Sequence, residues 1–197
     1  MGEHEEKIEI MRKYLADMTA AGNYHVKGNI PSKKIDNALQ TFAQGMDRTT
    51  MLGFLDTTVF GSGKNGYIFT DDKMYYVETM EKPKKLWYDD IKQLRILKSS
   101  KKDCNRELAI DFLDGSTFYI EGSFINKTPL KNFLNEMKNF EANKKAEKKK
   151  IENEKKNNFG AESAGRGLGA FRTVNNQFEE EKFHSRQGHG FAAERAN

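Results

Sequence analysis

Apolar and polar residues alternate in short runs between Gly66 and Glu121, and this alternation predicts an antiparallel sheet. Tyr67–Thr70 and Met74–Val77 are rich in aromatic and β-branched residues, which favour strands. Two aspartates separate these runs and favour a turn between them. The two runs are therefore predicted to form a β-hairpin.

A second hairpin is predicted further along the chain. Leu108–Phe112 and Thr117–Ile120 flank Asp114-Gly115, a dipeptide that readily takes the positive φ angles of a tight hairpin turn. Additional strands are predicted at residues 86–88 and 91–97. About six short strands thus follow one another without room for crossover helices, which excludes a parallel sheet.

A helix after the sheet is the expected cover for its apolar face. Thr128 is suited to cap this helix, and Pro129 to occupy its first position. The apolar positions that recur on one helical face are Leu130, Phe133, Leu134, Met137 and Phe140. Strands followed by one capping helix are the order of a pleckstrin-homology-like (PH-like) barrel. The predicted class is α+β: a PH-like, antiparallel, partly open barrel with N-terminal helices and a C-terminal capping helix.

Periodic apolar positions predict two helices near the N-terminus. The first ends near Ala21-Gly22, and its apolar face consists of Ile8, Met11, Tyr14, Leu15 and Met18. The second is capped by Ser32, and its buried stripe consists of Ile35, Ala38, Leu39, Phe42, Ala43 and Met46.

A third, short helix is predicted just before the sheet. Asp47 is suited to cap it, and its apolar residues are Met51, Leu52, Phe54 and Leu55. The polar residues 56–58 end this helix, and Val59-Phe60 is a candidate for a first strand.

Composition changes twice after the predicted capping helix. Residues 141–158 favour a helix but have no apolar face beyond Ile151, which predicts a solvated or frayed helical spacer. From Phe159 onward, glycines dominate. We therefore divide the chain into an N-terminal amphipathic helix, a PH-like domain, a charged helical spacer and a glycine-rich tail, at residues 1–24, 25–140, 141–160 and 161–197.

The net charge of +4 is concentrated in one segment of the 197-residue chain. Eight lysines and four glutamates lie between Lys138 and Lys156, and the remainder is neutral. The single cysteine, Cys104, excludes an intramolecular disulfide. The sequence has neither an apolar signal core at its start nor an apolar run long enough to span a bilayer. A cytoplasmic protein without a transmembrane segment is therefore expected.

Two glycine-rich stretches resemble fragments of phosphate-binding loops. In Gly61-Ser-Gly-Lys64, the pattern would need glycine in place of Thr58 and serine or threonine in place of Asn65, and a strand is predicted to follow. A turn is therefore predicted there. Gly165–Gly169 has no strand before it and is expected to be flexible linker.

No metal site is predicted from the histidines of the tail. His184, His189 and Glu194 are each five residues from the next, a spacing that places neighbours well over a right angle apart on a helix. Gly188 and Gly190 would also break such a helix. A site formed by a loop is the alternative.

Two groups of lysines are candidate binding residues. The first lies at the ends of the middle strands and suits an anionic ligand; it consists of Lys82, Lys84, Lys85, Lys98, Lys101 and Lys102. The second lies in the charged spacer and suits nucleic acid; it consists of Lys144, Lys145, Lys148, Lys149 and Lys150. The alternative in each case is structural, because lysines keep strand edges from pairing and keep charged helices solvated.

Three stretches resemble a bacterial PH-like domain found in uncharacterised cytoplasmic proteins. They are Ile30-Pro-Ser-Lys-Lys-Ile-Asp-Asn-Ala-Leu39, Leu55-Asp-Thr-Thr-Val-Phe-Gly-Ser-Gly-Lys64 and Gly66-Tyr-Ile-Phe-Thr-Asp71. The resemblance covers roughly residues 25–140. It implies a small, partly open barrel with a role in binding, since such barrels are more often scaffolds than enzymes.

The tail carries a second resemblance. Gln187-Gly-His-Gly-Phe-Ala-Ala-Glu-Arg-Ala-Asn197 is similar to the start of a restriction-endonuclease-like (PD-(D/E)xK) core. The resemblance implies that Glu194 would be a catalytic carboxylate. A divalent ion such as Mg²⁺ needs several oxygen ligands, and one carboxylate does not hold it. We therefore expect a chain truncated from a longer nuclease, although an accidental likeness is the alternative.

The function expected from these features is non-catalytic binding. The PH-like module would recognise a protein partner or control an attached effector domain, without a cofactor. The alternative is a fragment of a metal-dependent nuclease, in a bacterial defence or mobile-element system, that would need Mg²⁺. A weaker alternative is nucleic-acid binding through the lysine-rich spacer.

Overall fold

The computed structural model describes most of the chain up to Ser163. The described residues are 2–19, 23–78, 81–98, 101–122 and 124–163. The backbone divides into two compact units, Met1–Ile151 and Glu152–Asn197. The described residues of the second unit are helical.

The described residues form three α-helices and eight strands. The helices are α1 (Glu3–Met18), α2 (Ser32–Thr41) and α3 (Lys127–Ser163). The strands are β1 (Tyr24–Val26), β2 (Met51–Asp56), β3 (Gly66–Thr70), β4 (Lys73–Val77), β5 (Lys84–Trp87), β6 (Ile91–Ile96), β7 (Leu108–Phe112) and β8 (Thr117–Ile120). The α+β class predicted from the sequence is confirmed.

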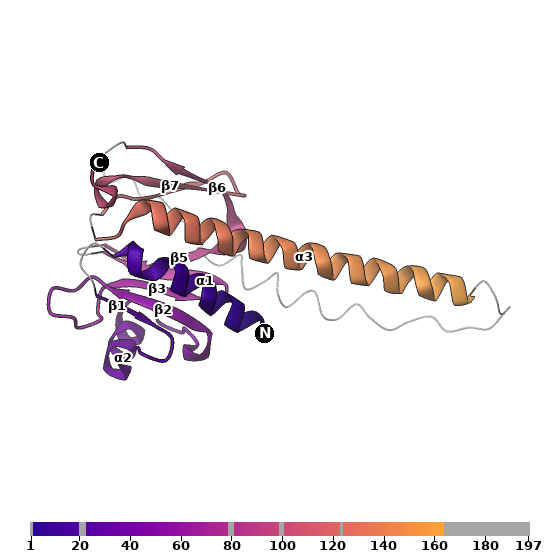
Figure 1. Cartoon of the computed structure of the whole chain (residues 1–197), viewed down its shortest axis with the longest axis horizontal. Coiled ribbons are helices and arrows are strands. Elements are labelled where there is room, and N and C mark those ends of the chain that lie inside the picture. Colours follow the sequence, from indigo (N-terminus) through magenta and orange to yellow (C-terminus); the bar gives the residue numbers. More distant parts are fainter. Residues whose placement is uncertain (1, 20–22, 79–80, 99–100, 123, 164–197) are drawn as a thin grey trace, which may run out of the picture. The chain divides into compact units, whose positions relative to one another are not determined.

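The strands build two antiparallel sheets, of order β1-β2-β3-β4-β5 and β6-β7-β8 (Figure 1). Both predicted hairpins are confirmed. In the β3–β4 hairpin Ile68 pairs with Tyr75, and in the β7–β8 hairpin Leu108 pairs with Ile120. Gly115, in the turn of the second hairpin, has a φ of 88°, as its Asp-Gly sequence favours.

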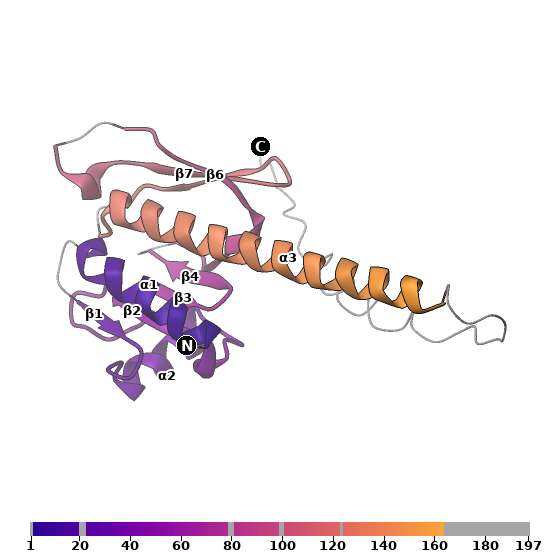
Figure 2. The ribbon, with the colours of Figure 1, turned by 45° about the vertical axis from the view of Figure 1, so that its right-hand side comes forward.

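The five-stranded sheet is apolar on both faces, and each face packs against different helices. Tyr67 and Phe69 point into a core that α1, α3 and the three-stranded sheet share. The ribbon shows the first part of α3 between the two sheets (Figures 1 and 2). Phe133 of α3 is fully buried in this core, with its ring centroid 5.1 Å from that of Phe69 in an edge-to-face arrangement. Fully burying such aromatic side chains contributes about 1.5–3 kcal/mol each.

The opposite face of this sheet packs against α2 and the residues that follow it. Ile68 and Tyr75 alternate with the residues of the first face, because successive side chains of a strand point to opposite sides. They pack with Ala38, Phe42 and their neighbours, and the Phe42 and Phe54 ring centroids are 6.4 Å apart. The buried stripe predicted for this helix therefore faces the sheet.

The prediction of a third short helix is wrong. Met51–Asp56 is strand β2, and all of its residues are buried between β1 and β3. A strand covered on both faces has a continuous apolar run, and such a run is also compatible with a helix. Asp47 does accept a hydrogen bond from the Thr49 amide (2.8 Å), but the helix that follows is only a single 3₁₀ turn. Val59 and Phe60 are not in a strand.

Three helix ends also differ from the predictions. Ser32 is the first residue of α2 and not its cap, because the N-cap position is held by Pro31. Helix α1 ends at Met18 rather than near Gly22, because Thr19 takes an extended conformation. Helix α3 begins one residue before Thr128, and its cap comes from another segment. The Asp103 carboxylate accepts hydrogen bonds from the Thr128 amide and hydroxyl, both at 2.7 Å.

Candidate functional site

The β2–β3 loop (residues 57–65) is organised by the carboxylate of Asp56. This side chain is fully buried. It accepts hydrogen bonds from the Thr58 amide (2.9 Å), the Thr58 hydroxyl (2.5 Å) and the Gly63 amide (3.1 Å), and Lys34 Nζ lies 2.9 Å away. Burial alone would raise the pKa of Asp56, but the bonds from Thr58 and Lys34 outweigh it and lower the pKa.

The same loop is fastened along α2. Asn37 donates a hydrogen bond to the Ser62 carbonyl (2.7 Å). The Thr41 hydroxyl donates to the Asn37 carbonyl of its own helix (2.7 Å) and also lies 3.2 Å from the Lys64 carbonyl. Gly63 has a φ of 74°, and a Cβ atom there would come within 2.9 Å of the Lys34 backbone. Only glycine allows the loop to approach the helix this closely.

The tip of the loop exposes two adjacent apolar residues. Val59 is 89% exposed and Phe60 is 96% exposed. They are the two most exposed large hydrophobic residues in the described part of the chain, and the next, Leu113, is 68% exposed. The turn that carries them is closed by a hydrogen bond from the Gly61 amide to the Thr58 carbonyl (3.1 Å). The residues on either side of the tip are therefore hydrogen-bonded to the fold, while the two apolar side chains of the tip are exposed to solvent.

This loop is not a phosphate-binding loop. The Gly63 amide, which would be available to a phosphate, donates to Asp56. Residues 61–64 lead into strand β3 and not into a helix, as the sequence predicts.

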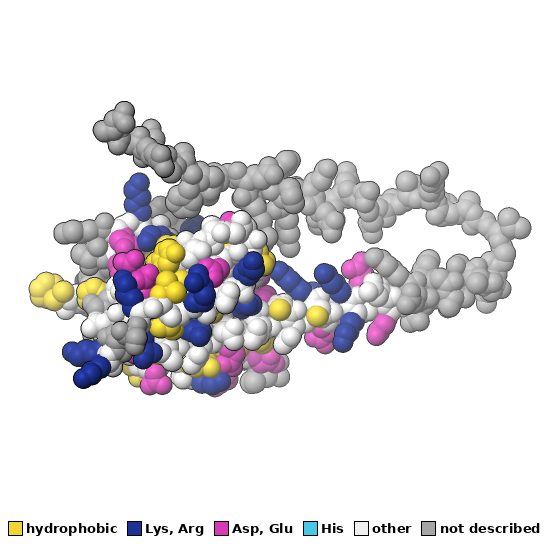
Figure 3. Space-filling view, turned by 90° about the horizontal axis from the view of Figure 1, so that it is seen from above, with side chains coloured by type: hydrophobic (Ala, Val, Ile, Leu, Met, Phe, Trp, Pro, Cys, Tyr) yellow, Lys and Arg dark blue, Asp and Glu magenta, His cyan; other side chains and the backbone are white. Residues whose placement is uncertain are grey.

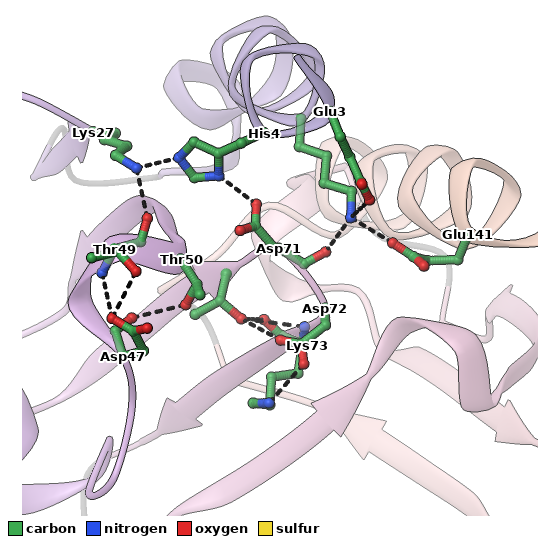
Figure 4. A network of polar contacts seen from close by, with 12 residues as sticks. Glu3, His4, Lys27, Asp47, Thr49, Thr50, Asp71, Asp72, Lys73 and Glu141 are labelled. Atoms are coloured by element: carbon green, nitrogen blue, oxygen red, sulfur yellow. Dashed lines mark hydrogen bonds and ion pairs between the residues drawn. The ribbon is translucent and has the colours of Figure 1, made fainter. Parts of the chain in front are cut away.

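A second polar cluster joins α1, the β3–β4 turn and α3 around Lys7. Figure 4 shows its partners Glu3, Asp71 and Glu141. Lys7 is 3% exposed, and its Nζ lies 2.6 Å from Glu141, 3.1 Å from Glu3 and 2.9 Å from the Asp71 carbonyl. The ammonium also lies 5.1 Å from the centroid of the Phe140 ring. Three oxygen partners satisfy the three N–H donors of the lysine, so the cluster is a structural junction.

His4 lies beside this junction, between an acid and a base. Its Nδ1 is 2.6 Å from an Asp71 carboxylate oxygen, and its Nε2 contacts Lys27 Nζ, which also donates to the Thr49 carbonyl (2.6 Å; Figure 4). A lysine ammonium can only donate, so Nε2 accepts and the ring proton is on Nδ1. Both nitrogens are therefore occupied, and this aspartate–histidine pair does not offer a general base to a substrate.

The face formed by the three-stranded sheet is chemically mixed. Figure 3 shows hydrophobic side chains there among those of Lys, Arg, Asp and Glu. Arg95 binds the Asp111 carboxylate through two hydrogen bonds of 2.7 Å, and the Thr117 hydroxyl donates a third of 2.8 Å. These bonds lower the pKa of Asp111 to about 2. Arg95 and Asp111 thus form an ion pair between β6 and β7.

The lysines predicted to bind an anionic ligand lie in two segments, residues 82–85 and 98–102. Two of them pair with carboxylates: Lys84 with Glu81 and Lys98 with Glu107, each at 2.6 Å. The exposed members include Lys82, Lys85, Lys101 and Lys102. Anion binding by this group stays a prediction.

The lysines predicted to bind nucleic acid lie on α3. Lys144 forms an ion pair with Glu3, and Lys145 forms one with Asp89 at 2.8 Å. Both pairs join α3 to other elements of the first unit. The side chains of Lys148, Lys149 and Lys150 are exposed. Binding of nucleic acid by this segment also stays a prediction.

The predicted residues of the tail lie outside the described part of the chain. They are Gly165–Gly169, His184, His189 and Glu194. Within the described residues, no group of three or more His, Cys, Asp or Glu side chains is placed to hold a metal ion. No helix of that part is long and apolar enough to cross a membrane. The nuclease alternative and its Mg²⁺ ion depend on the tail and stay predictions.

Comparison with known proteins assigns no family to this geometry. No family model, curated protein or solved structure matches the chain. The polar clusters at Asp56, Lys7 and His4 are saturated by internal partners. What the β2–β3 loop offers to another molecule is its pair of exposed apolar side chains.

Proposed function

We propose that this chain is a non-catalytic binding module with a PH-like fold, which recognises a protein partner and so controls an effector. The observation that carries the proposal is the order of elements. Four antiparallel strands, β2 to β5, are followed by three antiparallel strands, β6 to β8, and then by helix α3. Helix α3 packs its apolar face into the core between the sheets, as a capping helix of such a barrel does.

The chemistry of the buried polar groups supports binding over catalysis. Among the residues that the structure describes, the arrangements closest to a catalytic group are Asp56 and the His4–Asp71 pair. The Asp56 carboxylate binds Thr58, Gly63 and Lys34, and both ring nitrogens of His4 have partners within the fold. A catalytic acid or base must reach the substrate directly or through one water. Polar side chains whose hydrogen-bond partners all lie within the fold contribute to stability and not to contact with a substrate.

The proposal is tested by recovery of a partner. The full chain, with an affinity tag, is crosslinked in its own cells and purified under denaturing conditions, and the crosslinked proteins are quantified by mass spectrometry. A Leu15→Asp variant is the control, because Leu15 is fully buried in the core and an aspartate there unfolds the first unit. We expect a discrete protein that the folded chain recovers and the variant does not. Equal recovery by both, or no recovered protein, would overturn the proposal.

A further inference from the structure

We infer that Val59 and Phe60 form the contact that this module inserts into an apolar pocket of a protein partner. The inference rests on the proposed function and names the part of the surface that performs it. The two side chains are 89% and 96% exposed, and they are adjacent at the tip of the β2–β3 loop. Large aromatic side chains that are buried only in a complex are the usual anchors of protein–protein interfaces.

The loop is pre-organised to present this tip. Its base is tied to the end of β2 through Asp56, and its second half is tied to α2 through the bond from Asn37 to the Ser62 carbonyl. A loop that is already fixed loses little conformational entropy on binding. The internal bonds fix the turn while leaving both apolar side chains in solvent, which is the arrangement expected of a recognition loop.

The charges near the tip favour a protein over a lipid surface. Lys34 is neutralised by Asp56, which leaves Lys64 as the exposed cation of the loop and Lys33 as that of the adjoining helix start. Each lysine near an anionic bilayer raises its affinity roughly fivefold, and stable anchoring takes two strong signals. Two lysines and a pair of apolar side chains do not supply two strong signals for anchoring to a membrane. Lipid insertion also does not require a fixed loop.

The size of the Phe60 side chain determines how strongly its replacement should weaken binding to the partner. A phenylalanine ring buries about 150–250 Å² when it enters a pocket, and truncating such an anchor typically weakens binding by a factor of about thirty or more. Leu113 provides a matched control, because it is also exposed on a turn, between β7 and β8. Neither site contributes to the core, so serine substitutions there leave the fold intact.

The experiment compares the full chain with its Val59→Ser/Phe60→Ser and Leu113→Ser variants in the crosslinking assay described above. We expect the first variant to recover the partner at least about tenfold less well and the second to recover it as the unchanged chain does. Equal midpoints of thermal unfolding for the three chains would show that a loss of recovery does not result from misfolding. If the unchanged chain recovers a protein and the Val59→Ser/Phe60→Ser variant recovers it equally, the inference is overturned while the proposed function stands.

A second measurement separates the protein partner from the membrane. Benzoylphenylalanine is introduced at position 60 or 113 and photo-crosslinked in the same cells, and the purified chain is floated with phosphatidylcholine vesicles containing phosphatidylglycerol. The partner should be crosslinked from position 60 and not from 113, and the chain should not float. Phe60-dependent flotation, with no protein adduct at position 60, would show a lipid surface in place of the protein. An adduct of the chain with itself would identify a second copy as the occupant and would overturn the inference of a separate protein partner.

Discussion

Lys34 and Asp56, which are 22 residues apart in sequence, form an ion pair with an N–O distance of 2.9 Å, in which the aspartate side chain is fully buried. The pair joins α2 to the end of β2 at the point where the β2–β3 loop leaves the sheet. Because the other aspartate oxygen binds Thr58, the same carboxylate fixes both the helix and the loop.

Replacing Asp56 with asparagine should destabilise the fold by about 3 kcal/mol, because it leaves the Lys34 ammonium, which is mostly buried, without its counter-charge. The free energy of unfolding in urea measures the effect. Asp36→Asn is the control, since Asp36 pairs with Arg48 at an exposed site, and a change below about 0.5 kcal/mol is expected there.

The Asp56 contribution should also depend on pH. Its pKa is lower in the folded protein than the ordinary value of about 3.8. The stabilisation by the Asp56 carboxylate is therefore complete at pH values above the ordinary pKa. It is lost as the pH falls through the pKa that Asp56 has in the folded protein. The stability difference between the unchanged chain and Asp56→Asn should narrow on acidification, and a constant difference would contradict this assignment.

Lys7→Met should destabilise the protein by about 2 kcal/mol. Methionine fills a similar volume but leaves Glu141 and the Asp71 carbonyl without their donor at the junction of α1 and α3. Lys13→Met is the matched control on the same helix, because Lys13 pairs with Glu136 while 59% of its side chain is exposed. Equal losses in the two variants, measured by urea unfolding, would show that the junction is no stronger than a surface pair.

The neutral imidazole of His4 should carry its proton on Nδ1. Lys27 donates to Nε2 and Asp71 accepts from Nδ1, so only this tautomer satisfies both contacts. Long-range ¹H–¹⁵N correlation spectra of the full chain distinguish the two tautomers by their nitrogen shifts. In Lys27→Met, the donor to Nε2 is removed, and the fraction of the other tautomer should rise. An Nε2–H signal in the unchanged chain would show that the contacts differ from those described.

Local sequence patterns predicted the strands in which apolar and polar residues alternate and the helices whose apolar residues recur on one face. The β3–β4 and β7–β8 hairpins and the apolar face of α3 belong to this class. Strand β2 was missed because helices cover both of its faces, so that its apolar residues do not alternate. Strand β1 has three residues and no periodicity long enough to detect.

The candidate site depends on pairs that local patterns do not contain. Asp56 was assigned to a polar break, and only the fold brings it to Lys34. His4 and Asp71 are 67 residues apart, and Lys7 and Glu141 are 134 apart. The exposure of Val59 and Phe60 was not predicted either, because a short apolar run before a sheet is typical of a strand. The glycines at positions 61 and 63, which favour a turn, were the one local signal that a fixed loop lies there.

Asp111 should titrate with a midpoint of about 2, well below the ordinary value of about 3.8. The Arg95 guanidinium binds both carboxylate oxygens and is the larger cause, and the Thr117 hydroxyl adds a smaller one. Because the folded pKa is depressed, this group stabilises the protein fully above the ordinary pKa, and that stabilisation is lost as the pH falls toward 2. Carboxyl ¹³C shifts followed against pH report the midpoint directly. In Arg95→Gln the midpoint should rise most of the way to the ordinary value, and in Thr117→Val it should rise less. The prediction fails if Arg95→Gln leaves the midpoint unchanged, because the depressed pKa would then not come from the cross-strand ion pair.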